Sequence, residues 1–486
     1  MCGVLGVYAP GRDVARLSYF GLLALQHRGQ ESAGIAVSDG ARITALREMG
    51  LVAEAFSEEK LRGLRGQAAV GHCRYSTTGS ARWANAQPLV QHGGARTVAL
   101  AHNGNLTNAA ELRAELARGA IRLSSTSDTE AIAALVAHDG RPLAEAVAGA
   151  MPRLEGAFSA ALLAEGKLLG FRDPHGIRPL VLGRLPGPEE PRDAPPDPLD
   201  RESHHPPPDP LDRGYVIASE TCALDLLGAD FVREVEPGEL IVVDEGGVRS
   251  REAAEAGERA LCIFELIYFA RPDSKLRGVE LHRARVRMGE RLAREAPAEA
   301  DVVIPVPDSG TPSAIGYARA SGIPYSEGLI KSRYVGRTFI QPEQTLRELG
   351  IKTKFNPLSE VAGKRLVVVD DSIVRGSTTR KIVAMLFDAG ALEVHVRISS
   401  PPVVSPCFYG VDMATERELI AGSGGVAHVR TLIGATSLAY LSLAGLEAAT
   451  RRPGRTFCRA CLTGSYPTRV AGRDARDKLR FEPAVQ

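Results

Sequence analysis

The sequence predicts an α+β layered domain of antiparallel sheets, followed by an α/β domain built on a parallel sheet. Residues 1 to about 250 contain short apolar strands separated by Gly-rich turns, which is typical of stacked antiparallel sheets. After about residue 258, apolar strands alternate with helical segments, and this order predicts parallel strands. With 486 residues, 44% of them hydrophobic, the chain is long enough for two or three domains with sizeable cores.

Nine apolar segments are predicted as strands of the first domain. They are CGVLGVYA, AGIAVSD, AAVGHCRYS, TVALAHNGNL, FSAALLAE, KLLGFRD, PLVLGRL, YVIASE and GELIVVDE. Two helices are predicted between them, near residues 15–26 and over 128–137, with Ser127 as the N-cap of the second. Helices that cover a sandwich of sheets give a layered α+β architecture.

The segment at about 186–213 differs from its surroundings, because it is rich in Pro and charge and contains PPDPLDR twice, at 195–201 and 207–213. Such a composition cannot bury enough apolar surface to fold. We expect a disordered surface loop that joins two strands, either an inert insertion or a docking motif for a partner.

Charge and cysteine content exclude several classes of protein. Lys and Arg number 59 against 58 for Asp and Glu, so no bulk positive field would hold nucleic acid or an anionic membrane. No apolar run is long enough to span a membrane, and the first residues lack a signal-peptide pattern, so we expect a cytoplasmic protein. Seven cysteines are an odd number in a long chain, which favours reduced, working thiols over a disulfide framework.

Residues 367–379, VVVDDSIVRGSTT, are the most specific stretch of the chain. Three Val residues predict a buried parallel strand, and Asp370 and Asp371 fall at its carboxyl edge, where ligands bind in open α/β sheets. Gly376 allows close backbone approach at the start of a helix, whose first N–H groups attract anions. The hydroxyls of Ser372, Ser377, Thr378 and Thr379 lie in the same stretch. The paired carboxylates beside this phosphate cradle suggest either Mg²⁺ or sugar hydroxyls as their partner.

A second strand end, IPVPDSG at 304–310, places Asp308, Ser309 and Gly310 just ahead of another predicted helix, which suits a second phosphate group. Between the two strand ends lies a basic segment, at about 331–354, that begins with Lys331. This segment could close over a polyanionic substrate, or it could be a solvated surface loop.

Cys2 follows the initiator Met, and Gly3 beside it favours removal of that Met. A cysteine with its own α-amine combines a nucleophile and a base in one residue, because an α-amine titrates near pH 8 and can accept the thiol proton. By itself the segment CGVLGVY favours a strand that opens with a small apolar cysteine, and the segments downstream reverse that preference.

The stretch VVVDDSIVRGSTT resembles the phosphoribosyl diphosphate motif of type I phosphoribosyltransferases. The segments FELIYFARPDS, PVPDSG and KSRYVGRTFIQP narrow the resemblance to the glutamine phosphoribosylpyrophosphate amidotransferase family, whose motif order the chain follows over about residues 2–467. The resemblance implies an N-terminal-nucleophile hydrolase sandwich (αββα) over 2–250 and a phosphoribosyltransferase domain over 258–470. A flexible tail is expected over 471–486.

The same resemblance implies a glutamine site. It makes Cys2 the nucleophile, with Asn103 and the backbone of Gly104 as donors to the oxyanion. Arg74 and Asp128 would hold the α-carboxylate and α-ammonium of glutamine. Arg28 and Gly29 would shape the pocket beside the nucleophile. Cys73 departs from the family pattern, and we expect it to be a buried packing residue.

In the second domain the resemblance implies a set of residues that bind phosphoribosyl pyrophosphate. They are Asp308, Ser309, Gly310, Lys331, Asp370, Asp371, Ser372, Val374, Arg375, Gly376, Ser377 and Thr378. Ser309, Asp370 and Asp371 would adjoin Mg²⁺.

Four further cysteines, Cys262, Cys407, Cys458 and Cys461, are compatible by spacing alone with zinc, a redox pair or an iron-sulfur centre. Their contexts resemble the ligand positions of the family's iron-sulfur branch, which implies a [4Fe-4S] cluster with a structural role.

The activity implied by the resemblance is the synthesis of phosphoribosylamine from glutamine and phosphoribosyl pyrophosphate, the first committed step of purine synthesis. Feedback inhibition by purine nucleotides and a homotetramer are implied as well. Two alternatives remain open at this stage. One is another amidotransferase with an N-terminal Cys, such as a sugar-phosphate aminating synthase, and the other is a catalytically silent nucleotide-sensing regulator.

Overall fold

The computed structural model describes residues 1–76, 78–187, 214–332, 355–413, 419–422, 424–470 and 481–482. The chain forms two compact units. The first contains Met1–Leu261 together with Phe408–Asp412 and Pro467–Gln486, and the second contains Cys262–Cys407 and Met413–Tyr466. The predicted Pro-rich segment lies outside the described residues from 188 to 213, and the predicted basic segment does so from 333 to 354.

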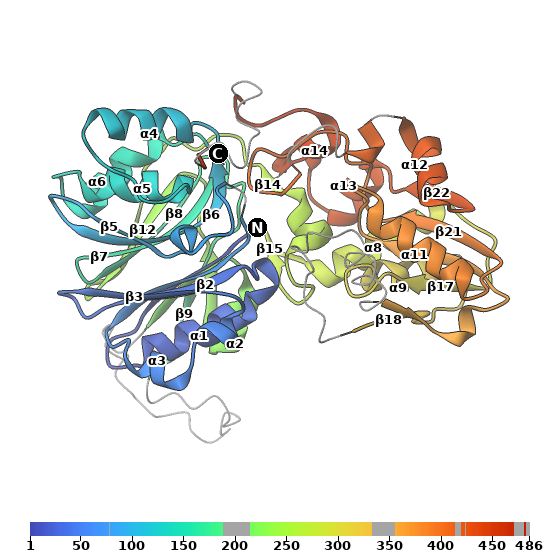
Figure 1. Ribbon diagram of the computed structural model, residues 1–486, viewed down its shortest axis with the longest axis horizontal. Coiled ribbons are helices and arrows are strands. Elements are labelled where there is room, and N and C mark those ends of the chain that lie inside the picture. Colours follow the sequence, from blue (N-terminus) through green and yellow to red (C-terminus); the bar gives the residue numbers. More distant parts are fainter. Residues whose placement is uncertain are drawn as a thin grey trace, which may run out of the picture. The chain divides into compact units, whose positions relative to one another are not determined.

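Two antiparallel sheets form the centre of the first unit (Figure 1). The seven-stranded sheet has the order β11 (Asp230–Glu234), β9 (Val181–Arg184), β10 (Tyr215–Ala218), β1 (Gly3–Tyr8), β4 (Ala68–Arg74), β2 (Ser32–Ser38) and β3 (Ile43–Met49). The six-stranded sheet has the order β13 (Gly247–Glu252), β12 (Glu239–Asp244), β8 (Lys167–Arg172), β7 (Gly156–Ala164), β6 (Thr97–Leu106) and β5 (Leu89–His92).

Helices cover the outer face of each sheet. The seven-stranded sheet is covered by α1 (Val14–Ala24), α2 (Val52–Ala55), α3 (Glu58–Arg62) and α7 (Thr221–Leu227). The six-stranded sheet is covered by α4 (Ala109–Arg118), α5 (Asp128–Ala137) and α6 (Leu143–Ala150). Strand β1 shows the layering, because Val4 and Tyr8 face the core between the sheets while Leu5 and Val7 face the core under α1. The predicted αββα sandwich is confirmed.

The predicted elements of this unit are present, with additions. All nine predicted strands form, and the predicted helices correspond to α1 and α5. The hydroxyl of Ser127 caps α5 by accepting a hydrogen bond from the Thr129 N–H at 3.2 Å. Helices α2, α3, α4, α6 and α7 and strands β3, β5, β11 and β13 were not predicted.

A short segment from late in the chain belongs to the first unit. The carbonyl of Phe408 accepts a hydrogen bond from the Asn105 side chain at 2.9 Å, and the carbonyl of Tyr409 accepts one from Arg178 at 2.8 Å. The hydroxyl of Tyr75 donates to the Asp412 carboxylate at 3.3 Å. Residues far beyond the sandwich in sequence therefore complete its hydrogen bonding.

The second unit contains a four-stranded parallel sheet, as predicted. Its order is β17 (Val302–Pro305), β20 (Arg365–Asp370), β21 (Glu393–Ile398) and β22 (Ser437–Tyr440). Helices α8 (Leu281–Glu295), α9 (Thr311–Ser321), α11 (Ser377–Asp388), α12 (Gly425–Ile433) and α13 (Leu443–Thr450) accompany it. The core includes Val368 and Val396 from the sheet and Ile382 and Leu386 from α11.

Short elements complete the described part of the second unit. They are β15 (Lys275–Leu276), β16 (Val279–Glu280), β18 (Leu329–Lys331), β19 (Phe355–Pro357), β23 (Phe457–Cys458), which pairs with β14 (Leu261–Cys262), and α14 (Ala460–Thr463). Within the described ranges, no helix is long and apolar enough to cross a lipid bilayer.

Candidate active sites

Cys2 lies at the start of β1, where its side chain is 6% exposed. Its backbone nitrogen donates to Oδ1 of Asn103 on β6 at 3.1 Å. Its sulfur contacts the backbone of Tyr75, just after β4, as an acceptor from the N–H at 3.4 Å and as a donor to the carbonyl at 3.3 Å. Both sheets of the sandwich therefore contribute to the position of the sulfur.

Asn103 offers a hydrogen-bond donor beside this thiol. The residue is 1% exposed, and its amide nitrogen Nδ2 is buried with no hydrogen-bond partner in the described structure. Buried donors are almost always paired, so a partnerless donor in contact range of a cysteine residue is suited to an oxygen that becomes negatively charged during a reaction. The sequence motif HNG, which also fits a simple turn, is here part of β6.

Gly104 adopts a backbone conformation that requires glycine. Its φ is +148°, and a Cβ at this position would lie 1.9 Å from the carbonyl oxygen of Ala157 on the neighbouring strand. Asn103 and Gly104 are adjacent on the same strand, so the backbone of Gly104 lies beside the amide of Asn103.

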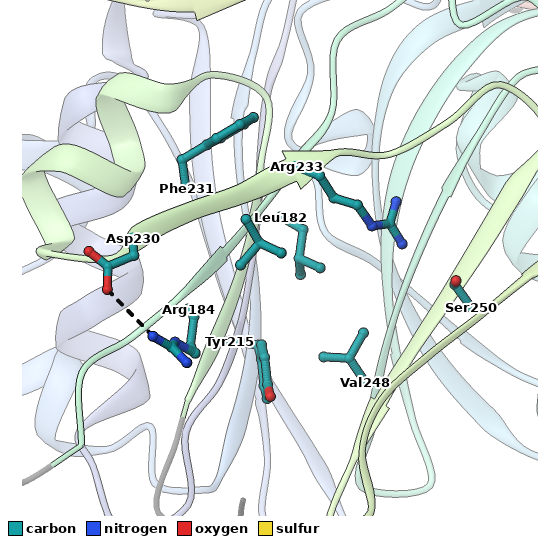
Figure 2. Close-up of a pocket in the computed structure, with 9 residues that line it drawn as sticks. Leu182, Arg184, Tyr215, Asp230, Phe231, Arg233, Val248 and Ser250 are labelled. Atoms are coloured by element: carbon teal, nitrogen blue, oxygen red, sulfur yellow. Dashed lines mark ion pairs between the residues drawn. The ribbon is translucent and has the colours of Figure 1, made fainter.

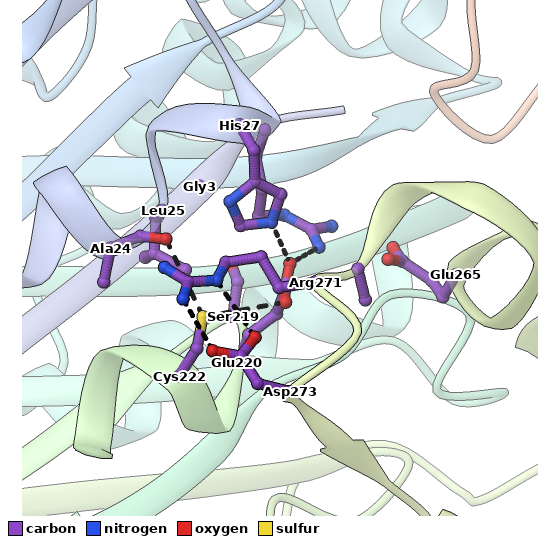
Figure 3. A network of polar contacts seen from close by, with 12 residues as sticks. Gly3, Ala24, Leu25, His27, Ser219, Glu220, Cys222, Glu265, Arg271 and Asp273 are labelled. Carbon is purple, nitrogen blue, oxygen red and sulfur yellow. Dashed lines mark hydrogen bonds and ion pairs between the residues drawn. The ribbon is translucent and has the colours of Figure 1, made fainter. Parts of the chain in front are cut away.

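Arg28 contacts the backbone of Cys2. Its Nε donates to the backbone carbonyl of Cys2 at 2.8 Å, and its guanidinium forms a buried ion pair with Glu220. His27 lies 2.8 Å from the same carboxylate, and Figure 3 shows Glu220 between His27 and Cys222. Burial alone would raise the pKa of Glu220, but the charges and hydrogen bonds of His27 and Arg28 lower it far below its usual value.

Gly29 follows Arg28 and makes a close backbone approach. A Cβ there would lie 2.5 Å from the carbonyl carbon of Arg74. Gly29 therefore allows the turn that carries Arg28 to pack directly against the end of β4.

Arg74 and Asp128, the predicted glutamine-binding pair, are both buried, with exposures of 2% and 4%. Arg74 donates to the carbonyls of Ser80 at 3.0 Å and Thr78 at 3.2 Å, and Asp128 accepts from the N–H of Leu106 at 2.9 Å. Burial lowers the pKa of Arg74, and the negative charges that oppose this shift are those of Cys2, Glu31, Asp128 and Glu482. The structure thus brings the predicted nucleophile and both predicted binding residues into one site.

Cys73 differs from Cys2 in its surroundings. It is fully buried in β4, its thiol donates to the carbonyl of Leu25 at 3.1 Å, and burial raises its pKa to about 12. A thiol with so high a pKa is a poor nucleophile, which supports the expected packing role.

In the second unit, Asp370 and Asp371 end β20 with exposures of 8% and 6%. Burial and the charge of Asp371 raise the pKa of Asp370 well above its usual value. Burial also raises the pKa of Asp371, although hydrogen bonds from the hydroxyls of Ser309 and Ser372 oppose the shift. Two adjacent buried carboxylates with raised pKa values are stabilised in their charged form by a bound cation or by hydroxyl donors.

The predicted phosphate loop leads from β20 into α11. Gly376 caps the helix with φ +70°, and a Cβ there would lie 2.7 Å from Ile420. Ser377 and Thr378 form the first turn, so their backbone N–H groups are among the helix donors without an intrahelical partner. The carbonyl of Val374 accepts from the Ile420 N–H at 3.1 Å, and Arg375 lies between Val374 and Gly376 in this loop.

The second predicted strand end lies next to the first, because β17 and β20 are parallel neighbours in which Pro305 pairs with Val369. Ser309 reaches Asp371, and Gly310 caps α9, where a Cβ would lie 2.4 Å from the carbonyl oxygen of Val369. Lys331 forms an ion pair with Asp308. The sequence motifs around 304–310 and 367–379 therefore form one site at the carboxyl edge of the sheet.

All seven cysteines lie in the described part of the chain, and none is in a disulfide. Burial raises the pKa of Cys461 well above its usual value, and the charges of three further cysteines, Cys407, Cys262 and Cys458, raise it more. The four predicted ligand cysteines are therefore within electrostatic range of one another. Across the described ranges, however, no group of three or more His, Cys, Asp or Glu side chains is arranged to hold a metal ion.

A pocket of about 420 Å³ lies elsewhere in the first unit, among β9, β10, β11 and β13 (Figure 2). Its lining includes Arg184, Tyr215, Phe231 and Arg233. None of the predicted site residues lines it, so it is separate from the chemistry described above.

Two domain families match the chain. Residues 72–189 match the glutamine amidotransferase domain, and residues 280–399 match the phosphoribosyl transferase domain. The second match weighs against a sugar-phosphate aminating synthase, which would share only the first half of the chain.

The chain is 51% identical to an amidophosphoribosyltransferase of Synechococcus elongatus, over 99% of this chain and 94% of that protein. It is 50% identical to an amidophosphoribosyltransferase of Mycobacterium tuberculosis, over 99% and 89%. A solved structure of the glutamine phosphoribosylpyrophosphate amidotransferase of Bacillus subtilis, complexed with ADP and GMP, has a TM-score of 0.85 and 43% identity, covering 97% of this chain and 98% of that one. With about half of its residues identical to these relatives over nearly its full length, the chain belongs to the amidophosphoribosyltransferase family.

Proposed function

We propose that this protein makes 5-phosphoribosylamine from glutamine and phosphoribosyl pyrophosphate, releasing glutamate and pyrophosphate, in the first committed step of purine biosynthesis. The observation that carries the proposal is the contact between Cys2 and Asn103 in the first unit: Oδ1 of Asn103 accepts from the Cys2 backbone nitrogen, and the amide nitrogen Nδ2 of Asn103 is buried without a partner in the described structure. The second unit supplies paired carboxylates beside a helix N-terminus, which suit a phosphorylated sugar.

In the glutaminase half, the sulfur of Cys2 attacks the side-chain amide carbon of glutamine. Removal of Met1 gives Cys2 an α-amine, which accepts the thiol proton and passes it to the leaving ammonia. Asn103 and the backbone N–H of Gly104 donate to the oxyanion. The resulting thioester is hydrolysed by water to glutamate, which restores the thiol.

The specificity of this half for glutamine comes from two buried, oppositely charged groups. The guanidinium of Arg74 pairs with the substrate α-carboxylate, and the carboxylate of Asp128 pairs with the α-ammonium. Arg28 and Gly29 fix the backbone of Cys2 beside them, as the 2.8 Å bond from Arg28 to the Cys2 carbonyl supports.

In the transferase half, ammonia attacks the anomeric carbon of phosphoribosyl pyrophosphate while the bond to pyrophosphate breaks. Residues 374–378 hold the 5′-phosphate through backbone N–H groups and hydroxyls, and Asp308, Ser309, Gly310 and Lys331 lie at the pyrophosphate. Asp370 and Asp371 orient the ribose and, together with Ser309, would hold Mg²⁺.

The donors at this edge suit magnesium. Mg²⁺ prefers oxygen ligands and is usually held by one or two carboxylates, with substrate phosphates and water completing its shell. The two carboxylates of Asp370 and Asp371 therefore suffice without a third acidic residue. When bound, the ion neutralises charge on the departing pyrophosphate.

Cys262, Cys407, Cys458 and Cys461 are proposed as ligands of a [4Fe-4S] cluster with a structural role. The effect of the other three thiols on the pKa of Cys461 supports this assignment, and thiolates are the donors that such clusters use. Anaerobically purified protein should contain iron and acid-labile sulfide and absorb visible light. Cys458→Ser should lose the iron, whereas Cys73→Ser should keep it; stoichiometric zinc in place of iron would refute the cluster.

Inhibition by purine nucleotides and a homotetrameric assembly are further parts of the proposal. The Bacillus subtilis relative was solved with ADP and GMP, which supports regulation by nucleotides. Titration of the activity with AMP, ADP and GMP, and light scattering of the purified protein, test the two points separately.

The central experiment compares two nitrogen sources. Cys2→Ala should abolish glutamine-dependent release of pyrophosphate while leaving the reaction with high ammonia intact. Loss of both reactions in a folded variant would contradict the division into two sites. A wild-type protein that lacks both activities, with Met1 removed, would instead favour the silent nucleotide-sensing regulator.

A further inference from the structure

Two residues near the end of the chain, Phe481 and Glu482, pack against the first unit beside the glutamine site. The Glu482 side chain is 9% exposed. Its Oε1 accepts hydrogen bonds from the Ser80 N–H at 2.7 Å and from the Thr126 hydroxyl at 2.6 Å. Its Oε2 lies 3.1 Å from the guanidinium of Arg82. One carboxylate therefore joins two loops that are distant in sequence.

Each of these loops leads directly to a glutamine-binding residue. The guanidinium of Arg74 is held by the carbonyls of Thr78 and Ser80, so the position of Ser80 affects the position of Arg74. Thr126 precedes the N-cap of α5, whose first residue is Asp128. Glu482 thus connects the loop that holds the guanidinium of Arg74 to the loop that leads to the carboxylate of Asp128.

Phe481 strengthens the contact to the second loop. The guanidinium of Arg113 lies over the Phe481 ring, 4.8 Å from its centroid, which is a cation–π distance. The same guanidinium donates to the carbonyls of Ser125 at 2.8 Å and Ser127 at 3.1 Å. The residues that flank Thr126 are therefore held by an arginine that packs on Phe481.

Glu482 is charged under working conditions. Burial alone would raise the pKa of Glu482, but hydrogen bonds from Thr126 and Ser80 and the charge of Arg82 lower it to about 2. A hydrogen bond to an ionised carboxylate is about twice as strong as one between neutral groups. The contacts of Glu482 with the two loops are therefore charge-assisted hydrogen bonds and an ion pair.

We propose that Glu482 is a positioning residue of the glutamine site, which fixes the spacing between Arg74 and Asp128 and thereby tunes the affinity for the amino-acid end of the substrate. This inference rests on the proposed glutaminase activity. It assigns a role to a residue about 400 positions away in sequence from the loop that it holds.

The test separates glutamine binding from chemistry. Glu482→Ala should raise the KM for glutamine about tenfold, which corresponds to about 1.4 kcal/mol, with kcat changed less than about twofold. Glu482→Gln keeps an acceptor oxygen for Ser80 and Thr126 but loses the charge, so its KM should rise only about threefold. Activity with high ammonia should be unchanged in both variants. Glu111→Gln, which alters an exposed carboxylate on α4, is the matched control.

A second measurement examines the hydrogen bond between Thr126 and Glu482. In Thr126→Val the hydroxyl donor is absent, so Glu482→Ala should raise KM by a smaller factor in that background than in the wild type. An unchanged KM in Glu482→Ala would overturn the inference, and so would equal losses of the glutamine and ammonia reactions. Failure of the proposed function itself would be visible earlier, as a wild-type protein without glutamine-dependent activity.

Discussion

Asn103 accepts the backbone N–H of Cys2 through Oδ1, while Nδ2 of the same side chain is buried without a partner in the described structure. The arrangement is costly for the resting protein, since an unsatisfied buried donor destabilises a fold by about 1–3 kcal/mol. The donor is matched to a negative oxygen that exists only during the reaction.

The first prediction concerns this donor. Asn103→Asp keeps the shape and the acceptor oxygen but replaces the amide donor, so glutamine-dependent kcat should fall by about 10²–10³. The KM for glutamine should change little, because Asn103 is proposed to contact the oxyanion rather than the amino-acid end. Steady-state kinetics with glutamine, with the ammonia reaction as the internal control, measure both values. A large rise in KM at unchanged kcat would contradict the proposed role.

The second prediction concerns Glu220, the buried partner of Arg28. Glu220→Gln leaves the Arg28 guanidinium without its counter-charge, and breaking a buried pair in this way costs about 3–5 kcal/mol of unfolding free energy. Glu58→Gln alters the ion pair with Arg16, which is about half exposed, and should cost less than about 1 kcal/mol. Chemical denaturation followed by circular dichroism compares the two variants. Equal stabilities would show that the buried pair contributes no more than a surface pair.

The third prediction uses the paired carboxylates at the end of β20. Burial and the charge of Asp371 raise the pKa of Asp370, so the negative charge at Asp370 destabilises the metal-free protein at neutral pH. Asp370→Asn should therefore raise the unfolding free energy of the metal-free protein while it abolishes the ammonia-dependent reaction. Asp388→Asn, at the exposed end of α11, should change neither. Thermal unfolding in EDTA tests the expected gain in stability, and pyrophosphate release with ammonia and Mg²⁺ tests the expected loss of activity.

The fourth prediction concerns pH. Burial lowers the pKa of His72 from 6.5 to about 3. Between these two pH values, His72 is therefore protonated in the unfolded chain and neutral in the folded chain. Stability from this group is complete above pH 6.5 and falls by about 1.4 kcal/mol per pH unit as the pH decreases toward 3. In His72→Gln the slope of unfolding free energy against pH should be smaller between pH 6.5 and 5. A slope equal to that of the wild type would contradict the assignment, although His102, whose pKa burial also lowers, keeps part of the slope in both proteins.

In the first unit, the strands of the two large sheets that the sequence did not predict all lie at sheet edges. β11 and β3 are the two edges of the seven-stranded sheet, and β13 and β5 are the two edges of the six-stranded sheet. Edge strands bury less of their surface, as the exposed residues of DFVRE in β11 and GVRSRE in β13 show. Polar and charged side chains are therefore tolerated there, and the apolar signal that identifies central strands is lost.

Helix α8 was missed for a related reason. Its sequence LHRARVRMGERLARE is rich in arginine, and one of these, Arg285, lies on the buried face at 2% exposure. It is accommodated because its guanidinium donates to the carbonyls of Leu266 at 2.8 Å and Ala270 at 2.7 Å. These carbonyls lie outside α8, so the sequence of the helix alone does not predict that Arg285 can be buried.

The site was predictable where its chemistry is local. Cys2, the strand end with Asp370 and Asp371, and the Gly376 turn each combine their reactive or binding groups within a few residues, so the sequence alone could propose them as site residues. Glu220 and Glu482 carry no local signal, because each acts on residues about 190 to 400 positions away. Long-range pairing of this kind becomes visible only when the fold is known.

The Phe408–Asp412 segment has a consequence for how the protein is made. The hydroxyl of Tyr75, whose backbone contacts the Cys2 sulfur, is anchored by Asp412, and Arg178 and Asn105 are anchored by Tyr409 and Phe408. A ribosome that has synthesised only the first 261 residues has not yet supplied these anchors. The first unit therefore completes its hydrogen bonding only after most of the second unit has been translated.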